Sequence, residues 1–352
     1  MHMADALISP AVGGVMWAVS AGAVAYSTAR IKKTSAEQED AGGGLVRKAS
    51  LMAMSGAFVF AAQMINFAIP GTGSSGHIGG GMLLACLLGS YPAMLTITSV
   101  LAIQALFFAD GGLLALGCNI FNMGVVPCLL VYPLVVKPLF QKRQAAGARG
   151  GFRYLTAGCV LGVMLALPLG AFFVVLETLA SRVTALPFST FLLLMLPIHV
   201  AIAVGEAAVT AAIVAFVASN GSDVIESAVS NAGVSKADAF KRILVILGVC
   251  ALVTGGVLSL FASSYPDGLE WSIEKITGSS DMEAEGAAFE RAAALQEAAA
   301  FMPDYDYRAA GEEGSASGAT VAGVVGSLIT CVVVGALGAA LYLLKRKKTP
   351  AL

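Results

Sequence analysis

Charged side chains are scarce in this chain. Only 12% of the 352 residues are Asp, Glu, Lys or Arg, whereas 57% are hydrophobic. Soluble domains carry roughly 25% charged residues, so a globule of this size would lack the polar surface that a soluble enzyme needs. The apolar excess also excludes an intrinsically disordered chain. The composition therefore predicts an all-α, polytopic membrane protein that lies among lipids.

Several chemical signatures are missing as well. The chain has no Gly-Lys pair and therefore no P-loop for ATP. Its 21 basic and 22 acidic residues nearly balance, which gives no electrostatic support to a nucleic-acid partner. No histidine is followed by Glu, so the zinc-protease pattern is absent. The six cysteines lie in apolar stretches, where we expect them to pack as small apolar residues and form no disulfide framework.

Long apolar runs are present and divide the chain into membrane-crossing segments. A spanning helix needs about 20 mostly apolar residues, and Pro92 and the glycines after Asp110 divide the longest run. Lys and Arg collect on the cytoplasmic side. If residues 77–90 and 92–109 cross separately, 17 of the 21 basic residues lie inside and 15 of the 22 acidic residues outside. This predicts about nine helices, with the N-terminus outside and the C-terminus inside, at residues 10–29, 49–69, 77–90, 92–109, 110–136, 156–176, 188–218, 243–262 and 321–344.

The pattern also predicts two regions. Residues 1–220 form a seven-helix unit, and residues 240–352 form a helix, an acidic outer segment at 263–319 and a final helix. The acidic segment carries 12 acids against 3 bases, so it is either a solvated loop or a collar that concentrates cations. Its Ala/Glu-rich stretch at 282–301 predicts a helix with Ser280 or Asp281 as N-cap. No basic start precedes the first apolar run, so we expect no signal peptide and an intact Met1.

Only three histidines exist, and two of them share the predicted outer side: His2 and His77. The α-amine of Met1, the backbone nitrogen of His2 and the His2 ring can close two fused chelate rings on one metal. His77 would add a fourth nitrogen, and a square-planar nitrogen set suits Ni(II) or Cu(II). The alternative is that His2 is a disordered terminal residue and that His77 starts a helix.

Other polar groups lie in or beside apolar helices. His199 and Glu206 are seven residues apart, on one face of a helix, where they form either a transport pathway or a satisfied buried pair. Four more could cap helices or orient metal ligands: Asn66, Asp110, Asn119 and Asn122.

Four motifs together make the sequence resemble the CbiM/NikM family, the cobalt/nickel substrate-specific components of energy-coupling factor (ECF) transporters. They are the MHMADALISP start, NFAIPGTGSSGH at 66–77, DGGLLALGCNIFNMG at 110–124 and HVAIAVGE at 199–206. PDGLEW at 266–271 and the two-helix tail resemble the small N-type accessory subunit, here fused to the same chain.

The resemblance implies a seven-helix fold that binds metal through the Met1 amine, His2 and His77. It also implies a transmembrane coupling subunit and ABC ATPase subunits on separate chains. We therefore predict no enzyme but a permease subunit in the cell membrane. It takes up Ni(II) or Co(II) for cobalamin biosynthesis or nickel enzymes. The Met3-Ala4-Asp5 start departs from the commoner family openings and leaves the metal undecided. The alternatives are a proton-coupled secondary transporter using His199 and Glu206, a membrane metalloenzyme and a purely structural subunit.

Overall fold

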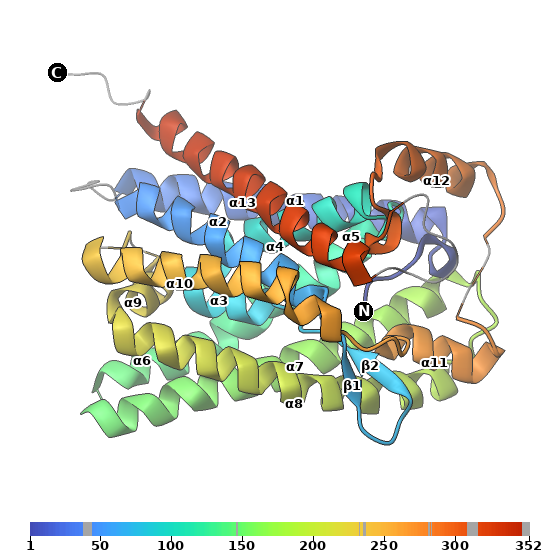
Figure 1. The fold of residues 1–352 in the computed structure, drawn as a ribbon, viewed down its shortest axis with the longest axis horizontal. Coiled ribbons are helices and arrows are strands. Elements are labelled where there is room, and N and C mark those ends of the chain that lie inside the picture. Colours follow the sequence, from blue (N-terminus) through green and yellow to red (C-terminus); the bar gives the residue numbers. More distant parts are fainter. Residues whose placement is uncertain are drawn as a thin grey trace.

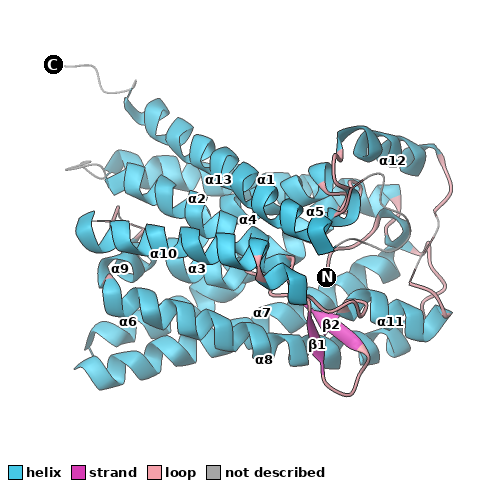
Figure 2. Ribbon diagram, viewed as in Figure 1, coloured by secondary structure: helices cyan, strands magenta, loops and turns pink. Residues whose placement is uncertain are grey.

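The computed structural model describes residues 1–37, 44–145, 147–231, 233–234, 237–280, 282, 284–307 and 316–346. Most of these residues form helices that run side by side along the long axis of the molecule (Figure 1), and the strands of the described part form a single short hairpin (Figure 2). The all-α membrane architecture is confirmed. The longest helices are α1 (Pro10–Glu37), α2 (Gly44–Gln63), α4 (Ser90–Phe107), α7 (Gly147–Ser181), α8 (Phe188–Asn220), α10 (Ala237–Gly256) and α13 (Ala316–Arg346).

Seven helical segments among the described residues are long and apolar enough to cross a membrane, so the predicted count of nine is not confirmed. The chain does break before Ser90, but helix α3 (Gly81–Leu88) has eight residues and is about 12 Å long, too short for a core of about 30 Å. The predicted span 243–262 is interrupted too, because α10 ends at Gly256 and is followed by a 3₁₀ turn, η3 (Leu258–Phe261).

The fourth of these seven segments has an unusual interior. Helix α5 (Leu116–Ile120) continues into a wide, π-helical stretch, η2 (Phe121–Val136), and then into α6 (Lys137–Ala145). Two prolines lie inside η2, Pro127 and Pro133. Proline has no N–H to donate and its ring crowds the preceding turn, so a widened turn lets this helix continue across the apolar layer.

The second half of the chain packs on the first. Helix α13 lies mainly along α2 and α10, and the short helix α11 (Gly268–Thr277) lies against α8. Helix α12 (Ala287–Ala299) and the turn η4 (Pro303–Tyr305) lie at the end of α4 (Figure 1). The prediction that Ser280 caps α12 is wrong. The helix begins after Gly286, whose position provides no side-chain cap. Asp281 lies outside the described residues.

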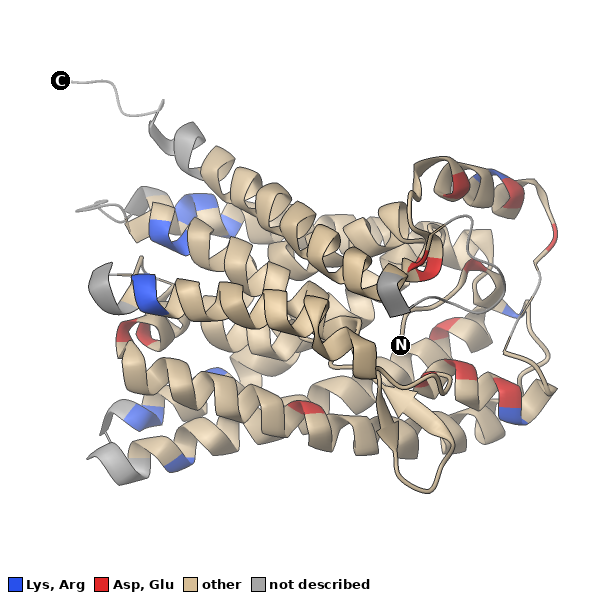
Figure 3. Ribbon diagram, viewed as in Figure 1, with Lys and Arg blue, Asp and Glu red and all other residues tan. Residues whose placement is uncertain are grey.

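Charge is sorted between the two ends of the molecule. Figure 3 shows Lys and Arg mainly at the end where α1 meets α2 and α6 meets α7, and Asp and Glu mainly at the end that carries α11 and α12. The short helix α9 (Ser222–Ser230) adds acidic residues to the basic end. The chain start lies inside the acidic end, beneath the accessory helices (Figure 1). The accessory region is residues 240–352.

A β-hairpin sets the position of the glycine-rich loop at residues 71–76. Strand β1 (Phe67–Ile69) pairs with β2 (Ser74–Gly76) in antiparallel register, with Phe67 opposite Gly76. His77 follows β2 directly, and an irregular stretch of three residues separates it from α3. His77 therefore does not start a helix, which removes one of the two readings of this residue.

Candidate metal centre

The first residues of the chain are fixed in place from both sides. The Asn119 side chain accepts a hydrogen bond from the Met3 backbone N–H at 2.8 Å and donates one to the Met3 carbonyl at 3.3 Å. Gly112 N–H donates to the same carbonyl at 2.9 Å. Because a side-chain amide that both donates and accepts matches a peptide unit, Asn119 sets the register of the chain start and with it the positions of Met1 and His2.

Two glycines let the chain start approach this closely. A Cβ atom on Gly112 would lie 1.8 Å from Oδ1 of Asp5, and one on Gly111 would lie 2.8 Å from Nδ2 of Asn119. Gly111 also has a φ of +80°, which side chains other than glycine rarely adopt. The Asp-Gly-Gly motif thus provides a surface without side chains over which residues 2–5 pass.

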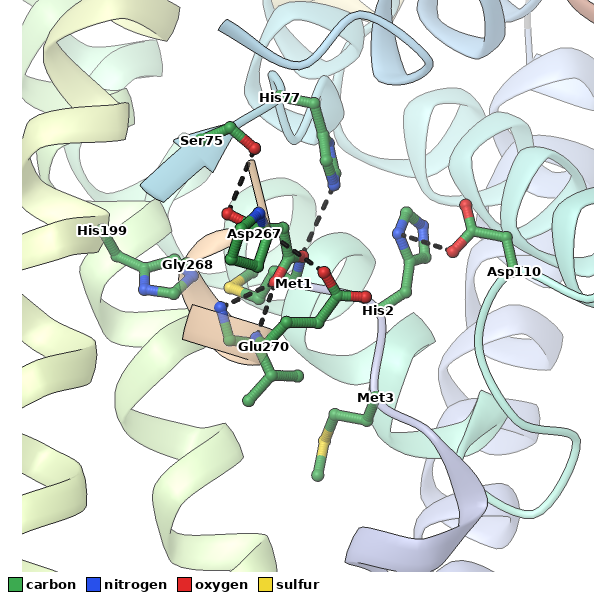
Figure 4. Close-up of polar contacts among 12 residues, drawn as sticks. Met1, His2, Met3, Ser75, His77, Asp110, His199, Asp267, Gly268 and Glu270 are labelled. Carbon is green, nitrogen blue, oxygen red and sulfur yellow. Dashed lines mark hydrogen bonds and ion pairs between the residues drawn. The ribbon is translucent and has the colours of Figure 1, made fainter. Parts of the chain in front are cut away.

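Met1 and His77 face each other across a small cavity. The α-amino nitrogen of Met1 lies 3.5 Å from Nε2 of His77, and Nδ1 of His77 lies 3.0 Å from the Ile78 carbonyl (Figure 4). A carbonyl only accepts hydrogen bonds, so Nδ1 carries the hydrogen and Nε2 directs its lone pair at Met1. Burial, together with the nearby amino group and His2, lowers the pKa of His77 to about 3. The ring is therefore neutral at pH 7, as a metal ligand must be.

His2 lies beside this pair. Its ring stacks on the His77 ring with the centroids 5.2 Å apart and an angle of 24° between the planes. Nδ1 of His2 lies 3.3 Å from Asp110, and Nε2 lies 3.2 Å from the Gln104 amide oxygen. Burial lowers the pKa of His2, although the Asp110 carboxylate partly opposes it. Chelation with the Met1 amine requires Nδ1 to turn from Asp110 toward the chain start.

A carboxylate from the accessory region completes the surroundings of Met1. Oδ2 of Asp267 lies 2.5 Å from the α-amino nitrogen of Met1. Its other oxygen accepts hydrogen bonds from the backbone N–H groups of Leu269 and Glu270 and so caps helix α11. Burial alone raises the pKa of Asp267, but the positive amino group outweighs this and holds the pKa well below its usual value.

The accessory region also reaches the His2 side of the site. The Tyr305 hydroxyl donates to Asp110, the carboxylate that faces His2. The Gln296 amide donates to the carbonyls of Ala105 and Gly111 at 2.8 Å each. Asp267 at the start of α11, Gln296 of α12 and Tyr305 of η4 therefore contact both sides of the site from the acidic end of the molecule.

The remaining predicted residues have hydrogen-bond partners other than the three candidate ligands, although His199 lines a cavity together with Met1 and His77. The Glu206 carboxylate accepts hydrogen bonds from the backbone N–H groups of Gly79 and Gly80, at 2.8 and 3.0 Å. Nδ1 of His199 lies 2.7 Å from the Met195 carbonyl oxygen. The two side chains are therefore not a satisfied pair. Asn122 donates to Glu177 at 2.8 Å, and the Asn66 carbonyl accepts from Ser263 N–H at 2.7 Å.

Sequence reasoning missed two neighbours of the site, Gln104 and Asp267. Gln104 is a single amide in an apolar helix, and that isolation in α4 was the available signal. Asp267 is one of 12 acids in its segment, and only its place in the PDGLE motif distinguishes it. Within the described ranges, no three His, Cys, Asp or Glu side chains gather as a metal cluster.

Comparison with known proteins identifies the fold and its two parts. Residues 2–224 match the family model described as the cobalt uptake substrate-specific transmembrane region, CbiM. The chain belongs to the CbiM family. Residues 241–343 match a second model, the PDGLE domain. This CbiM-family chain is thus a component of a cobalt or nickel transporter, with the metal as its transported substrate, and is no enzyme.

Individual relatives agree with this assignment. A relative from Haloquadratum walsbyi is 30% identical over 67% of this chain and 98% of its own length. The fused nickel transport protein NikMN of Rhodobacter capsulatus is 35% identical over 43% of this chain and 38% of its own. A solved transition metal transporter, 25% identical, covers 62% of this chain and 93% of its own with a TM-score of 0.50. The CbiM-family chain is accordingly a multi-pass membrane protein with a fused accessory part.

Proposed function

We propose that this protein captures Ni(II) or Co(II) with four nitrogens and delivers it as the substrate-capture subunit of an ECF-type ABC transporter. The nitrogens are the α-amine of Met1, the backbone and ring nitrogens of His2, and Nε2 of His77. The observation that carries the proposal is the 3.5 Å separation between the Met1 amine and His77 Nε2. Metal–nitrogen bonds of about 2 Å put two donors on one ion about 2.8 to 4 Å apart.

The chemistry of these donors supports the same substrate class. Amine and imidazole nitrogens suit nickel, cobalt and copper better than magnesium or calcium, which prefer oxygen. Copper would win on affinity alone, so selection for nickel or cobalt has to come from the shape of the cavity and from metal supply. The rigid hold of Asn119 on the Met3 backbone favours one fixed coordination geometry.

One extra glycine before Met1 tests the chelate. Added by cleaving a fusion tag next to it, the glycine moves the α-amine away from the His2 backbone nitrogen and breaks both fused rings, while both histidines stay. We expect the purified full chain to lose its stoichiometric nickel. A glycine added after Leu352 is the matched control and should leave nickel content unchanged. If the N-terminal variant holds as much nickel as the parent, the chelate proposal is wrong.

The proposal extends to direction and partners. The N-terminus and the acidic accessory helices face the outside, and the basic end faces the cytoplasm, because Lys and Arg favour the cytoplasmic side. A transmembrane coupling subunit and ABC ATPase subunits on separate chains supply the energy, since this sequence has no P-loop. The metal taken up then feeds cobalamin biosynthesis or nickel enzymes.

The proposed division of labour follows the two regions. Residues 1–220 bind the metal, and residues 240–352 act as the N-type accessory region. Every proposed ligand comes from the first region. The second region contacts the site through Asp267, which pairs with the Met1 amine, and through Tyr305, which bonds Asp110 beside His2.

A proton-coupled transporter that uses His199 and Glu206 is not favoured. A relay needs the two side chains to exchange a proton directly or through a short chain of groups. Glu206 instead has both oxygens bound to backbone N–H groups, and His199 is bound to the Met195 carbonyl. Uptake that persisted without an ATPase and collapsed with the proton gradient would revive this alternative.

A further inference from the structure

His199 is presented to the cavity in the same way as His77. Its Nδ1 lies 2.7 Å from a backbone carbonyl, that of Met195, so the hydrogen is on Nδ1 and the Nε2 lone pair is exposed to the surroundings in the neutral ring. The side chain is 1% exposed, and Nε2 has no hydrogen-bond partner within the part of the chain that the structure describes. A cavity lined by His199 is also lined by Met1, His77 and Asp267. His199, on helix α8, is thus a second imidazole that lines the cavity shared with Met1 and His77.

The accessory region closes this cavity with a glycine. A Cβ on Gly268 would lie 3.1 Å from Cε1 of His199, between the two ring nitrogens, and equally close to Ile198 and Ile202. A side chain here would push the imidazole or the isoleucines back by a few tenths of an ångström, so glycine allows the closest approach of α11 to the imidazole. Asp267 precedes Gly268 directly, and Figure 4 shows the His199 ring directed toward these two residues.

We propose that His199 Nε2 and the Asp267 carboxylate form a transient metal site next to the four-nitrogen chelate. The proposal rests on the chelate being the tight site. One imidazole and one carboxylate, with water in the remaining positions, suit a borderline divalent ion such as Ni(II) or Co(II). Two protein donors bind weakly, and weak neighbouring sites are what allow an ion to move on.

The position of Asp267 gives this site a role in loading. In the structure the Oδ2 atom of Asp267 pairs with the α-amino group of Met1. An incoming cation on His199 competes for that same oxygen atom. Once the carboxylate turns to the cation, the amine loses its partner and lies beside the metal that it is to bind. The transient site therefore releases the first ligand of the tight site as the metal arrives.

Loading kinetics of the full chain in detergent test this. His199→Asn keeps an N–H donor where Nδ1 bonds the Met195 carbonyl and removes Nε2. Ni(II) is mixed with the empty protein, and binding and release are followed by the visible absorption of the square-planar complex. We expect both rates to fall about ten-fold or more, with an unchanged dissociation constant and spectrum. Thr210→Val, which alters another buried polar side chain of α8, is the matched control and should keep the parent rates.

Two results would overturn the transient site. Unchanged rates in His199→Asn would show that the metal loads without this imidazole. A weaker dissociation constant or an altered spectrum would make His199 a ligand of the tightly bound metal instead. His199→Gln, which restores a polar atom near the Nε2 position, should regain part of the loading rate if the fold is intact. A parent protein that binds no nickel would instead refute the proposed function, so the two failures are distinguishable.

Discussion

The α-amino nitrogen of Met1 and Oδ2 of Asp267 lie 2.5 Å apart, although 266 positions separate the two residues. Both groups are largely removed from solvent, with 4% and 15% of the side-chain surface exposed for Met1 and Asp267. A buried charge without a partner is costly, so each group depends on the other. This contact ties the accessory region to the part of the chain that we propose binds the metal.

Two substitutions of Asp267 should separate the contribution of its ion pair with Met1 from that of its helix cap on α11. Asn is as good a helix N-cap as Asp, so Asp267→Asn removes the ion pair while retaining the cap of α11. Asp267→Ala removes both. Because breaking a buried ion pair costs about 3–5 kcal/mol and losing a cap about 1 kcal/mol, we expect thermal unfolding midpoints to fall in the order parent, Asn, Ala.

A charge control comes from the same helix. Glu274 lies on α11 and is exposed, so Glu274→Gln removes one negative charge without touching Met1 and should leave the midpoint within a degree or so. If Asp267→Asn melts at the parent temperature, the ion pair contributes nothing to docking.

Glu206 should support nickel binding through the loop that follows His77. Its two oxygens hold the N–H groups of Gly79 and Gly80. Glu206→Gln places an amide NH₂ where one oxygen accepts, and an unpaired buried N–H costs about 1–3 kcal/mol. We expect roughly ten-fold weaker nickel binding, measured by competition titration.

A double mutant separates this role from general stability. His77→Ala alone should lower nickel retention without preventing membrane insertion, because the side chain is a ligand in the proposal. Adding Glu206→Gln to His77→Ala should then cause little further loss, since coupled residues are not additive. Full additivity of the two effects would show that Glu206 does not act through His77.

Gly112 should not tolerate a side chain. A Cβ there would overlap Oδ1 of Asp5 at 1.8 Å and approach its backbone nitrogen at 2.4 Å. Gly112→Ala must displace the chain start, so we expect loss of bound nickel from a protein that still inserts into the membrane. Gly14→Ala is the control, because nothing lies within 4 Å of its Cβ position in α1 and alanine favours a helix. Equal nickel content in both variants would contradict this packing argument.

The sequence predicted the helices better than it predicted the contacts between them. Apolar length identifies spanning helices because lipid demands it. Pro92 predicts a break between residues 90 and 92, and the structure places it slightly earlier, at Gly89. The short length of α3 was not predicted, because residues 77–80 form a loop that is hydrogen-bonded to Glu206 instead of the first turn of the helix. Apolar content alone does not show where an apolar segment stops being helical.

The same limit applies to the site. His2 and His77 were expected on one side, and the structure brings their rings together. His199 and Glu206 do lie on one helix, but seven residues correspond to about 10.5 Å along its axis, too far for a direct bond. Glu206 bonds the backbone of Gly79 and Gly80 in another segment, as Asp267 does for Met1, whereas His199 bonds the Met195 carbonyl of its own helix. Such long-range pairs leave no periodic pattern in a sequence.

Because the accessory helices are covalently linked to the rest of the chain, their docking is intramolecular. Helices α9 and α10 connect α8 to α11 within one chain, so docking of Asp267 on Met1 is an intramolecular event with an effective concentration set by the connection. Dilution in the bilayer or unequal synthesis of two subunits cannot separate the halves. Every copy that reaches the membrane carries one accessory region for each chain start, and this fixed ratio is built into the gene product.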